Sequence, residues 1–131
     1  MVASTTINFN NIQLHHKIWL AASDDTGILG DGKWQILRAI EETGSLTGAC
    51  TKLKLTYRRT WGDLKKIEQM LGFPLLEKSR GGAEGGSSTL SPQGKLLVKA
   101  FDKFHEQVDG VIADAFTELK TCLLEINSGK R

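Results

Sequence analysis

One stretch, residues 44–72, constrains the fold of this chain more than any other. Its apolar residues recur with the period of two helices joined by a turn too short for a strand. The apolar stripe of the first helix falls at i, i+3, i+4 and i+7, on Leu46, Ala49, Cys50 and Leu53. Ser45 precedes the first helix and Thr56 precedes the second, and both residue types cap helix N-termini. The stretch therefore predicts a helix-turn-helix over residues 45–71.

The second helix, expected over residues 56–71, separates apolar from basic side chains. Its apolar face carries residues that lie within about 60° of one another, namely Thr60, Leu64, Ile67 and Leu71. Its opposite face carries Arg58, Gly62, Lys65 and Gln69, flanked by Tyr57, Arg59, Trp61 and Lys66. This polarity is typical of a helix that enters the major groove of DNA with its back against the domain. Gly62 costs roughly 1 kcal/mol relative to alanine in a helix, and on the exposed face it would let the backbone approach phosphates or base edges closely.

A solvated surface helix is the alternative interpretation, because lysine and arginine side chains on helices mostly face water. The formal net charge of +2 is too small to decide between the two. The distribution of charge favours DNA, since residues 52–66 contain Lys52, Lys54, Arg58, Arg59, Lys65 and Lys66 against only Asp63.

The composition indicates an ordinary soluble globular protein. With 131 residues, 40% hydrophobic and 24% charged, the chain forms one domain or a small domain with an extension. Cys50 and Cys122 occupy apolar positions without partners at metal-binding spacing, which indicates reduced thiols. No stretch approaches the roughly 18 apolar residues of a membrane span, and a signal-peptide pattern is absent. We therefore expect a cytoplasmic protein without a metal, a cofactor or a membrane partner.

The N-terminal third predicts a polar tail, a β-hairpin and a supporting helix. Residues 1–13 are polar and rich in asparagine, either a frayed tail or a short edge strand. Residues 15–30 hold two apolar runs around a turn cluster, which predicts a hairpin. Asp31 is expected to cap a helix over residues 33–43 that ends at Gly44. His15 and His16 have no third ligand nearby, so exposed histidines at a strand end are the simpler interpretation.

Residues 27–33 also fit G-x-x-x-x-G-K, the start of a phosphate-binding loop. The next residue should be Ser or Thr to hold magnesium but is Trp34, and Asp31 would bring negative charge towards a phosphate. The rest of the chain does not predict the alternating strands and helices of a parallel sheet. An anion-responsive enzyme built on this loop is therefore disfavoured. No catalytic constellation appears elsewhere in the sequence, so we do not expect an enzyme.

A glycine-rich segment follows the helix-turn-helix. Two short extended pieces around it predict a β-hairpin over about residues 75–91, the wing of a winged helix-turn-helix. Contacts with DNA phosphates or the minor groove are predicted for basic side chains and bare amides, namely Lys78, Arg80, Gly81 and Gly82. A surface loop without a partner is the alternative.

Ser91 and Pro92 begin the last predicted helix. Its apolar residues follow a heptad seam, interrupted by Glu118, on Leu97, Phe101, Phe104, Val108, Val111, Ala115 and Cys122. A three-helix core cannot cover so much apolar surface, so we expect this seam to form a homodimer interface. The predicted layout is a winged helix-turn-helix domain over residues 1–92, a dimerisation helix over 93–124 and a tail over 125–131.

These segments resemble the N-terminal DNA-binding domain of ModE-type molybdate-responsive regulators. The resemblance rests on GSLTGACTKL, on LTYRRTWGDLKKIEQMLG with Tyr57 and Trp61, and on PLLEKSRGGAEGGSSTLSPQGKLL. The helix-turn-helix alone would equally suit the broader LysR-type class, and the glycine-rich wing favours ModE. Thr60 and Gly62 depart from the family pattern, which favours Ala at the first position and often has Asp at the second.

The resemblance implies an α+β fold, a winged helix-turn-helix that dimerises on an operator with two-fold symmetry. The implied DNA-contacting residues of the helices are Ser45, Thr47, Thr56, Tyr57, Arg58, Arg59 and Lys65. In the wing, the implied contacts are Arg80, Gly81 and Gly82. Full-length regulators of this type continue into molybdate-binding domains, and this sequence stops at Arg131 without further predicted strands. We therefore expect either a stand-alone variant or a fragment, and a stand-alone variant would not sense molybdate directly.

Two functions stay open at this point. The chain is expected to be a sequence-specific transcriptional regulator of ModE type that binds double-stranded DNA as a homodimer. The alternative is an interaction module that does not bind DNA and forms a heterodimer with a full-length regulator through its last helix.

Overall fold

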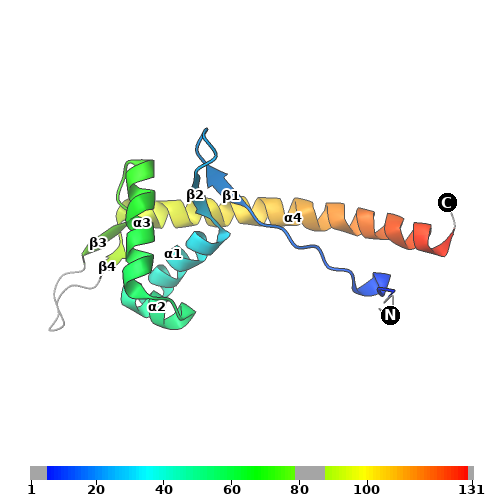
Figure 1. Cartoon of the computed structure of the whole chain (residues 1–131), viewed down its shortest axis with the longest axis horizontal. Coiled ribbons are helices and arrows are strands. Elements are labelled where there is room, and N and C mark those ends of the chain that lie inside the picture. The colour runs from blue at the N-terminus through cyan, green and yellow to red at the C-terminus, as the bar shows by residue number, and fades with distance from the viewer. Residues whose placement is uncertain (1–5, 79–87, 130–131) are drawn as a thin grey trace, which may run out of the picture. The chain divides into compact units, whose positions relative to one another are not determined.

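The computed structural model describes residues 6–78 and 88–129. Two antiparallel hairpins and a group of helices make up an α+β fold, as Figure 1 shows. The elements in chain order are η1 (Phe9–Asn11), β1 (Trp19–Ala21), β2 (Gly27–Gly30), α1 (Asp31–Thr43), α2 (Leu46–Leu53), α3 (Tyr57–Leu71), β3 (Leu76–Lys78), β4 (Ser88–Leu90) and α4 (Pro92–Ser128). The predicted winged helix-turn-helix, with an N-terminal hairpin and a long last helix, is confirmed.

The described residues divide into two units, and each has its own contacts. One unit comprises residues 17–102 and the other combines residues 1–16 with residues 103–131. Helix α4 is continuous through the boundary. The first unit, called the winged unit below, contains both hairpins and helices α1 to α3.

The core of the winged unit lies between α1, α2, α3, the wing strands and the first turns of α4. Its most deeply buried apolar side chains are Leu37, Ile40, Leu46, Leu64 and Leu75. Val98 and Phe101 bring α4 into the same cluster. Apart from Leu75, which precedes β3, these positions follow the helical period of their elements, because each helix buries one face and leaves the other in water.

The ends of the helices follow from local chemistry. The Ser45 hydroxyl oxygen accepts from the Gly48 N–H at 2.9 Å and so caps α2. Gly44 and Gly72 adopt left-handed backbone conformations, with φ of 89° and 83°, after the last residues of α1 and α3. The prediction that Asp31 caps α1 is wrong, because Asp31 is its first residue and Gly30 is the N-cap. The Asp31 carboxylate instead accepts from the Ile18 N–H at 3.3 Å, across the first hairpin.

Each hairpin pairs in a defined register. In the first, Trp19 lies opposite Gly30 and Leu20 opposite Leu29. In the wing, Leu76 lies opposite Leu90 and Lys78 opposite Ser88. Leu76 and Leu90 are buried against the core, whereas Glu77 and Lys78 are exposed. The end of β3 therefore carries two charged side chains in solvent.

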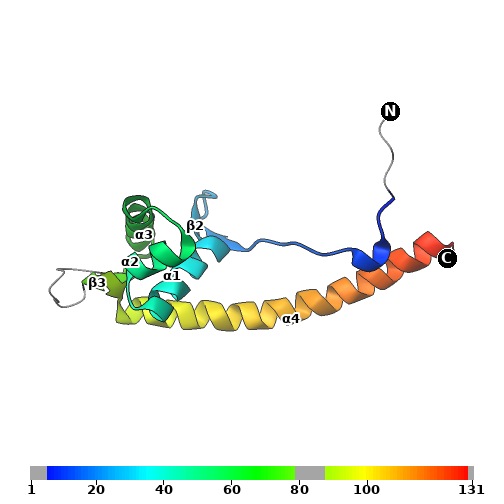
Figure 2. The same ribbon diagram turned by 90° about the horizontal axis from the view of Figure 1, so that it is seen from below.

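The second unit consists of the N-terminal segment and the rest of α4. Figure 2 shows η1 beside the C-terminal part of α4, where the Lys120 ammonium donates to the Asn10 carbonyl oxygen at 2.7 Å. Residues 9–11 form a 3₁₀ turn, and residues 6–13 contain no strand, so the edge strand predicted within residues 1–13 is not found in their described part. The predicted tail is also shorter than expected, because α4 continues to Ser128 and ends at Gly129, whose φ is +75°. No helix within the described ranges is long and apolar enough to cross a membrane.

Candidate nucleic-acid interface

Helix α3 has the polarity that its sequence predicts. Thr60, Leu64 and Ile67 are at most 5% exposed and hold the back of the helix against the core. Arg58, Arg59 and Lys66 are exposed on the other side, with Tyr57 and Trp61 beside them at 40% and 42% exposure. Basic and aromatic side chains therefore share the solvent face of a rigidly held helix.

The two acidic side chains of α3 are already engaged. The Asp63 carboxylate lies 3.4 Å from the Lys33 ammonium of α1, and the Glu68 carboxylate lies 3.1 Å from the Lys65 ammonium one turn earlier. Arg58, Arg59 and Lys66 make no ion pair with any described residue. The exposed face is consequently positive, because Arg58, Arg59 and Lys66 lack acidic partners among the described residues while Asp63 and Glu68 are paired.

Lys65 differs from the other basic residues of α3. Besides its ion pair with Glu68, its ammonium lies 5.4 Å from the centre of the Trp61 ring, within the range of a cation–π contact. Its side chain is 36% exposed. Lys65 is therefore partly committed to its own helix, and it would have to leave Glu68 to bind a phosphate directly.

Glu68 connects α3 to the base of the wing. One carboxylate oxygen accepts from the backbone N–H groups of Leu75 and Leu76, at 2.7 and 2.9 Å. The side chain is 12% exposed. Burial by itself would raise the pKa of Glu68, but the two amide hydrogen bonds and the Lys65 ammonium outweigh burial and hold the pKa below its ordinary value. The carboxylate is thus kept ionised as a fixed acceptor for the start of β3.

The carbonyl side of the same backbone segment is held by the start of α4. The Ser91 hydroxyl donates to the Pro74 carbonyl oxygen at 2.6 Å, and the Ser91 N–H donates to the Leu75 carbonyl oxygen at 2.8 Å. Gly94 allows this approach, because a Cβ at that position would collide with the Leu75 carbonyl oxygen. Residues 74–76, named the wing base here, are therefore held by α3 on one side and by α4 on the other.

The other predicted contact residues divide by exposure. Thr47 and Thr56 are exposed, whereas Ser45 is half-buried and its hydroxyl is used as the α2 cap. Lys78 is exposed at the end of β3. The remaining predicted wing contacts, Arg80, Gly81 and Gly82, lie outside the described residues.

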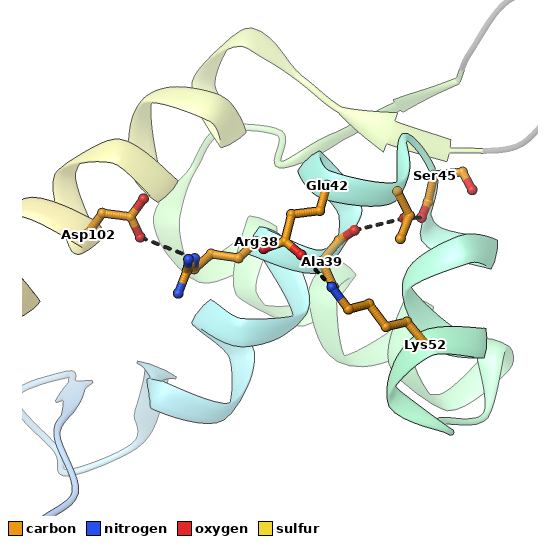
Figure 3. Close-up of polar contacts among 7 residues, drawn as sticks. Arg38, Ala39, Glu42, Ser45, Lys52 and Asp102 are labelled. Atoms are coloured by element: carbon orange, nitrogen blue, oxygen red, sulfur yellow. Dashed lines mark hydrogen bonds and ion pairs between the residues drawn. The ribbon is translucent and has the colours of Figure 1, made fainter.

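The helix that precedes α3 is tied back to α1. Figure 3 shows Lys52 of α2 against Glu42 of α1, and Arg38 of α1 reaching towards Asp102 of α4 with 3.7 Å between Nε and Oδ1. The Thr43 hydroxyl donates to the Ala39 carbonyl oxygen at 2.7 Å beside the turn that leads into α2. Lys52 therefore already has an anionic partner within the protein, unlike Arg58 and Arg59.

The predicted dimer seam is only partly exposed. Phe101 is 5% exposed and stacks on Trp34 with 5.7 Å between ring centres, and Leu97 packs against the same core. Phe101 therefore has little surface left for a second subunit, contrary to its assignment to an interface. Later seam residues stay accessible, with Phe104 at 41% and Val111 at 69% exposure, Ala115 exposed, and Val108 and Cys122 half-buried.

Comparison with known proteins identifies the segment that carries α3. Residues 32–95 match the family model of the bacterial regulatory helix-turn-helix protein, lysR family. Over these residues the chain is similar to LysR-family helix-turn-helix proteins. The matched range contains α2, α3 and the wing base.

Relatives of the LysR-family segment include proteins of the predicted ModE type. The molybdenum-pterin-binding protein MopB of Rhodobacter capsulatus is 30% identical over 56% of this chain and 27% of its own length. The transcriptional regulator ModE of Haemophilus influenzae is 29% identical over 52% of this chain and 27% of its own length. The chain thus spans about a quarter of the length of these relatives, and the resemblance to ModE-type regulators is confirmed over that part.

A solved structure shows the same fold. The full-length LTTR LysG from Corynebacterium glutamicum, with bound effector Arg, superposes with a TM-score of 0.50 at 21% identity, over 66% of this chain and 28% of that chain. The LysR-family arrangement of helices and wing is therefore shared at the level of architecture.

Sequence reasoning missed Glu68, Ser91 and Gly94 as a group that positions the wing. Glu68 reads as a solvated helix residue, and Ser91 reads only as a helix cap. The signal that could have revealed Glu68 is its place near the end of α3, a few residues before an extended segment whose amides need acceptors.

Proposed function

We propose that this chain is a sequence-specific transcriptional regulator of ModE type that binds double-stranded DNA as a homodimer. The single observation that supports DNA binding most directly is the exposed face of α3. Arg58, Arg59 and Lys66 have no partner among the described residues, while the back of the same helix is fixed in the core. Guanidinium and ammonium groups on a rigid helix are what the phosphates and base edges of a major groove require.

The contact residues fall into two roles. Base edges are read by residues at the start of α3, where Arg58 can form a bidentate pair with guanine that discriminates by about 1–3 kcal/mol. Phosphates are held by the flanking residues, which are Ser45, Thr47, Thr56, Tyr57, Arg59, Lys65, Lys66, Lys78, Arg80, Gly81 and Gly82. Several phosphate contacts of this kind make the affinity fall steeply as the salt concentration rises.

The homodimer is supported by an apolar stripe on the second unit. Four side chains on one face of α4 are between 41% and 69% exposed, namely Phe104, Val111, Leu119 and Ile126. At about 100° per residue they lie within about 80° of one another, and Ala115 and Cys122 lie on the same face. The N-terminal segment follows a neighbouring face, where His16 approaches Asp109 and Asn10 approaches Lys120. The stripe is therefore open for the same stripe of a second copy.

Binding to selected duplexes tests both parts of the proposal. The purified chain is used to select sequences from a random duplex pool. Its affinity for the most enriched duplex is then measured by fluorescence anisotropy at several salt concentrations. Sedimentation equilibrium measures the mass of the free protein and of the complex. We expect a selected motif with two-fold symmetry, a steep salt dependence and two chains per duplex.

A different outcome would support the alternative function. Absence of any salt-dependent binding, together with a mixed dimer when the chain is mixed with a full-length ModE-type regulator, would identify an interaction module that does not bind DNA.

A further inference from the structure

The glycines inside the helices of the winged unit differ in whether the surrounding structure has room for a side chain. A Cβ at Gly48 would lie 2.8 Å from the Thr43 side chain, and one at Gly94 would meet the Leu75 carbonyl oxygen, so both positions need glycine for packing. A Cβ at Gly62 of α3 would meet nothing within 4 Å, and its φ is not in the left-handed range. Neither packing nor backbone conformation within the protein therefore requires glycine at position 62.

Glycine in the middle of a helix is unfavourable, because it loses more conformational entropy on folding than other residues do and adds no side-chain contact. Position 62 lies in the interior of a 15-residue helix, with five residues before it and nine after it. Gly62 thus weakens the free protein without an internal reason, as Gly110 of α4 also does, and its surroundings distinguish it.

The surroundings of Gly62 indicate what kind of partner this is. The neighbours of a helical residue on the helix surface are at i−4, i−3, i+3 and i+4. Around Gly62 all these positions are basic, namely Arg58, Arg59, Lys65 and Lys66. The nearest acid in sequence, Asp63, is paired with Lys33, and Glu68 is turned to the wing base. At Gly62, helix backbone without a side chain is therefore surrounded by four basic residues.

We propose that Gly62 is the point of closest approach between α3 and the DNA duplex. The sugar-phosphate backbone or a base edge lies directly against the helix backbone at this residue, with Arg58 at the base edges and Arg59, Lys65 and Lys66 at the phosphates around it. This inference rests on the proposed DNA binding and adds a residue that sets how closely α3 docks on the duplex. A methyl group at position 62 would lift the helix and weaken the contacts of its neighbours together.

The decisive variants are Gly62→Ala and Gly62→Leu, with Gly110→Ala as the matched control. Gly110 also lies inside a helix, its Cβ would also meet nothing within 4 Å, and it lies on neither the apolar stripe nor the side of α4 that meets the N-terminal segment. Alanine at either position favours the helix, so both variants are expected to raise the melting temperature by about 3–5 °C. A merely structural role for Gly62 would predict the opposite sign.

Affinity for the selected duplex is then measured for each variant at one salt concentration. We expect Gly62→Ala to bind about tenfold more weakly, the loss of one good contact, Gly62→Leu to bind more weakly still, and Gly110→Ala to bind as the wild type does. Gly62→Ala that melts higher and binds as tightly as the wild type would overturn this inference while leaving the proposed function intact. A wild-type chain that binds no duplex would overturn both, so the two failures are distinguishable.

Discussion

The two longest described helices, α3 and α4, expose side chains of opposite character. Helix α3 buries Leu64 and Ile67 and presents arginine and lysine to water, whereas α4 presents Val111, Leu119 and Ile126. Basic side chains in water cost the free protein little, because they remain hydrated. Apolar side chains at 51–69% exposure lack the stabilisation that removal from water would give. This contrast fits the proposed function, in which α4 pairs with a second copy and α3 binds DNA.

The largest effect is expected from Val111→Asp, which tests the α4 side of this contrast. The substitution places a carboxylate in the centre of the apolar stripe, and burying an unpaired charge in an interface costs about 3–5 kcal/mol. Dimerisation should therefore weaken by more than about a hundredfold. Because Val111 is 69% exposed in the single chain, the helix content should change little at protein concentrations where the wild type is also monomeric. Sedimentation equilibrium over a range of concentrations measures the effect.

Ala113→Asp is the control for this substitution. Ala113 is exposed and lies two residues further along α4, about 200° around the helix from Val111. The same charge on that face should leave the dimer intact. Equal weakening by both variants, or a wild-type chain that is monomeric at tens of micromolar, would remove the proposed interface.

Glu68→Ala tests whether α3 is coupled to the wing. The variant removes the acceptor for two backbone amides and the partner of Lys65, and hydrogen bonds to charged groups contribute about 1.5–3 kcal/mol. We expect the free energy of unfolding to fall by about 2–3 kcal/mol, measured by urea denaturation. Glu68→Gln keeps a carbonyl oxygen for the amides and should lose less. Gln69→Ala, at the exposed neighbouring position, should be nearly neutral.

The pH dependence of this effect follows from the lowered pKa of Glu68. A carboxylate with a lower pKa in the folded state stabilises the protein at pH values above its unfolded pKa of about 4.3. The advantage of the wild type over Glu68→Gln should therefore be complete at neutral pH. It should disappear as the pH falls through the lower folded-state pKa. An advantage that grows on acidification would contradict the assignment of the carboxylate as the acceptor.

A smaller effect, on DNA affinity, separates two basic residues of α3. Arg58→Ala should weaken binding to the preferred duplex by about 1–3 kcal/mol and reduce the preference for it over a random duplex. Lys66→Ala should weaken both duplexes alike and reduce the slope of log affinity against log salt by about one phosphate contact. Titration of both duplexes by fluorescence anisotropy, at several salt concentrations, measures the preference and the salt slope of each variant. Equal loss of preference in both variants would reject this division of roles.

The smallest effect is expected where the start of α4 is anchored to the winged unit. The Trp34 indole N–H donates to the Asp102 carboxylate at 2.7 Å, and Arg38 lies near both residues. Trp34→Phe removes this hydrogen bond and should lower the free energy of unfolding by about 1 kcal/mol, with DNA affinity unchanged. Trp19→Phe is the matched control, because Trp19 is 60% exposed and should be replaceable at almost no cost. A neutral Trp34→Phe would show that packing alone anchors α4.

Local periodicity accounts for how much of the fold could be predicted. The stripes through Leu46 and Leu64, the Ser45 cap and the Gly44 stop follow from neighbours a few residues apart, and all are observed. The link between Trp34 and Asp102 joins residues 68 positions apart, and nothing local marks it. The heptad seam was ambiguous for a related reason. The same spacing describes Phe101, which packs into its own core, and Val111, which is exposed.

The sequence predicts the charge of the candidate site, but it does not predict which of its side chains are held by their neighbours. Arg58, Arg59 and Lys66 face water as the helical wheel requires. Lys65 has the same position in the pattern, but Glu68 and Trp61 hold it, because side chains one turn apart compete with any ligand. The role of Glu68 at the wing base required the tertiary structure, since its partners are backbone amides that carry no sequence signature.

The Glu68 clamp also bears on how such proteins could be retargeted to new operators. A recognition helix grafted from another regulator would bring its own residue to position 68, and the amides of Leu75 and Leu76 would lose or keep their acceptor accordingly. The transplantable cassette is therefore longer than the helix. It runs from Thr56 through the wing base, and a graft that stops at Gly72 would change which bases are read and where the wing lands at the same time.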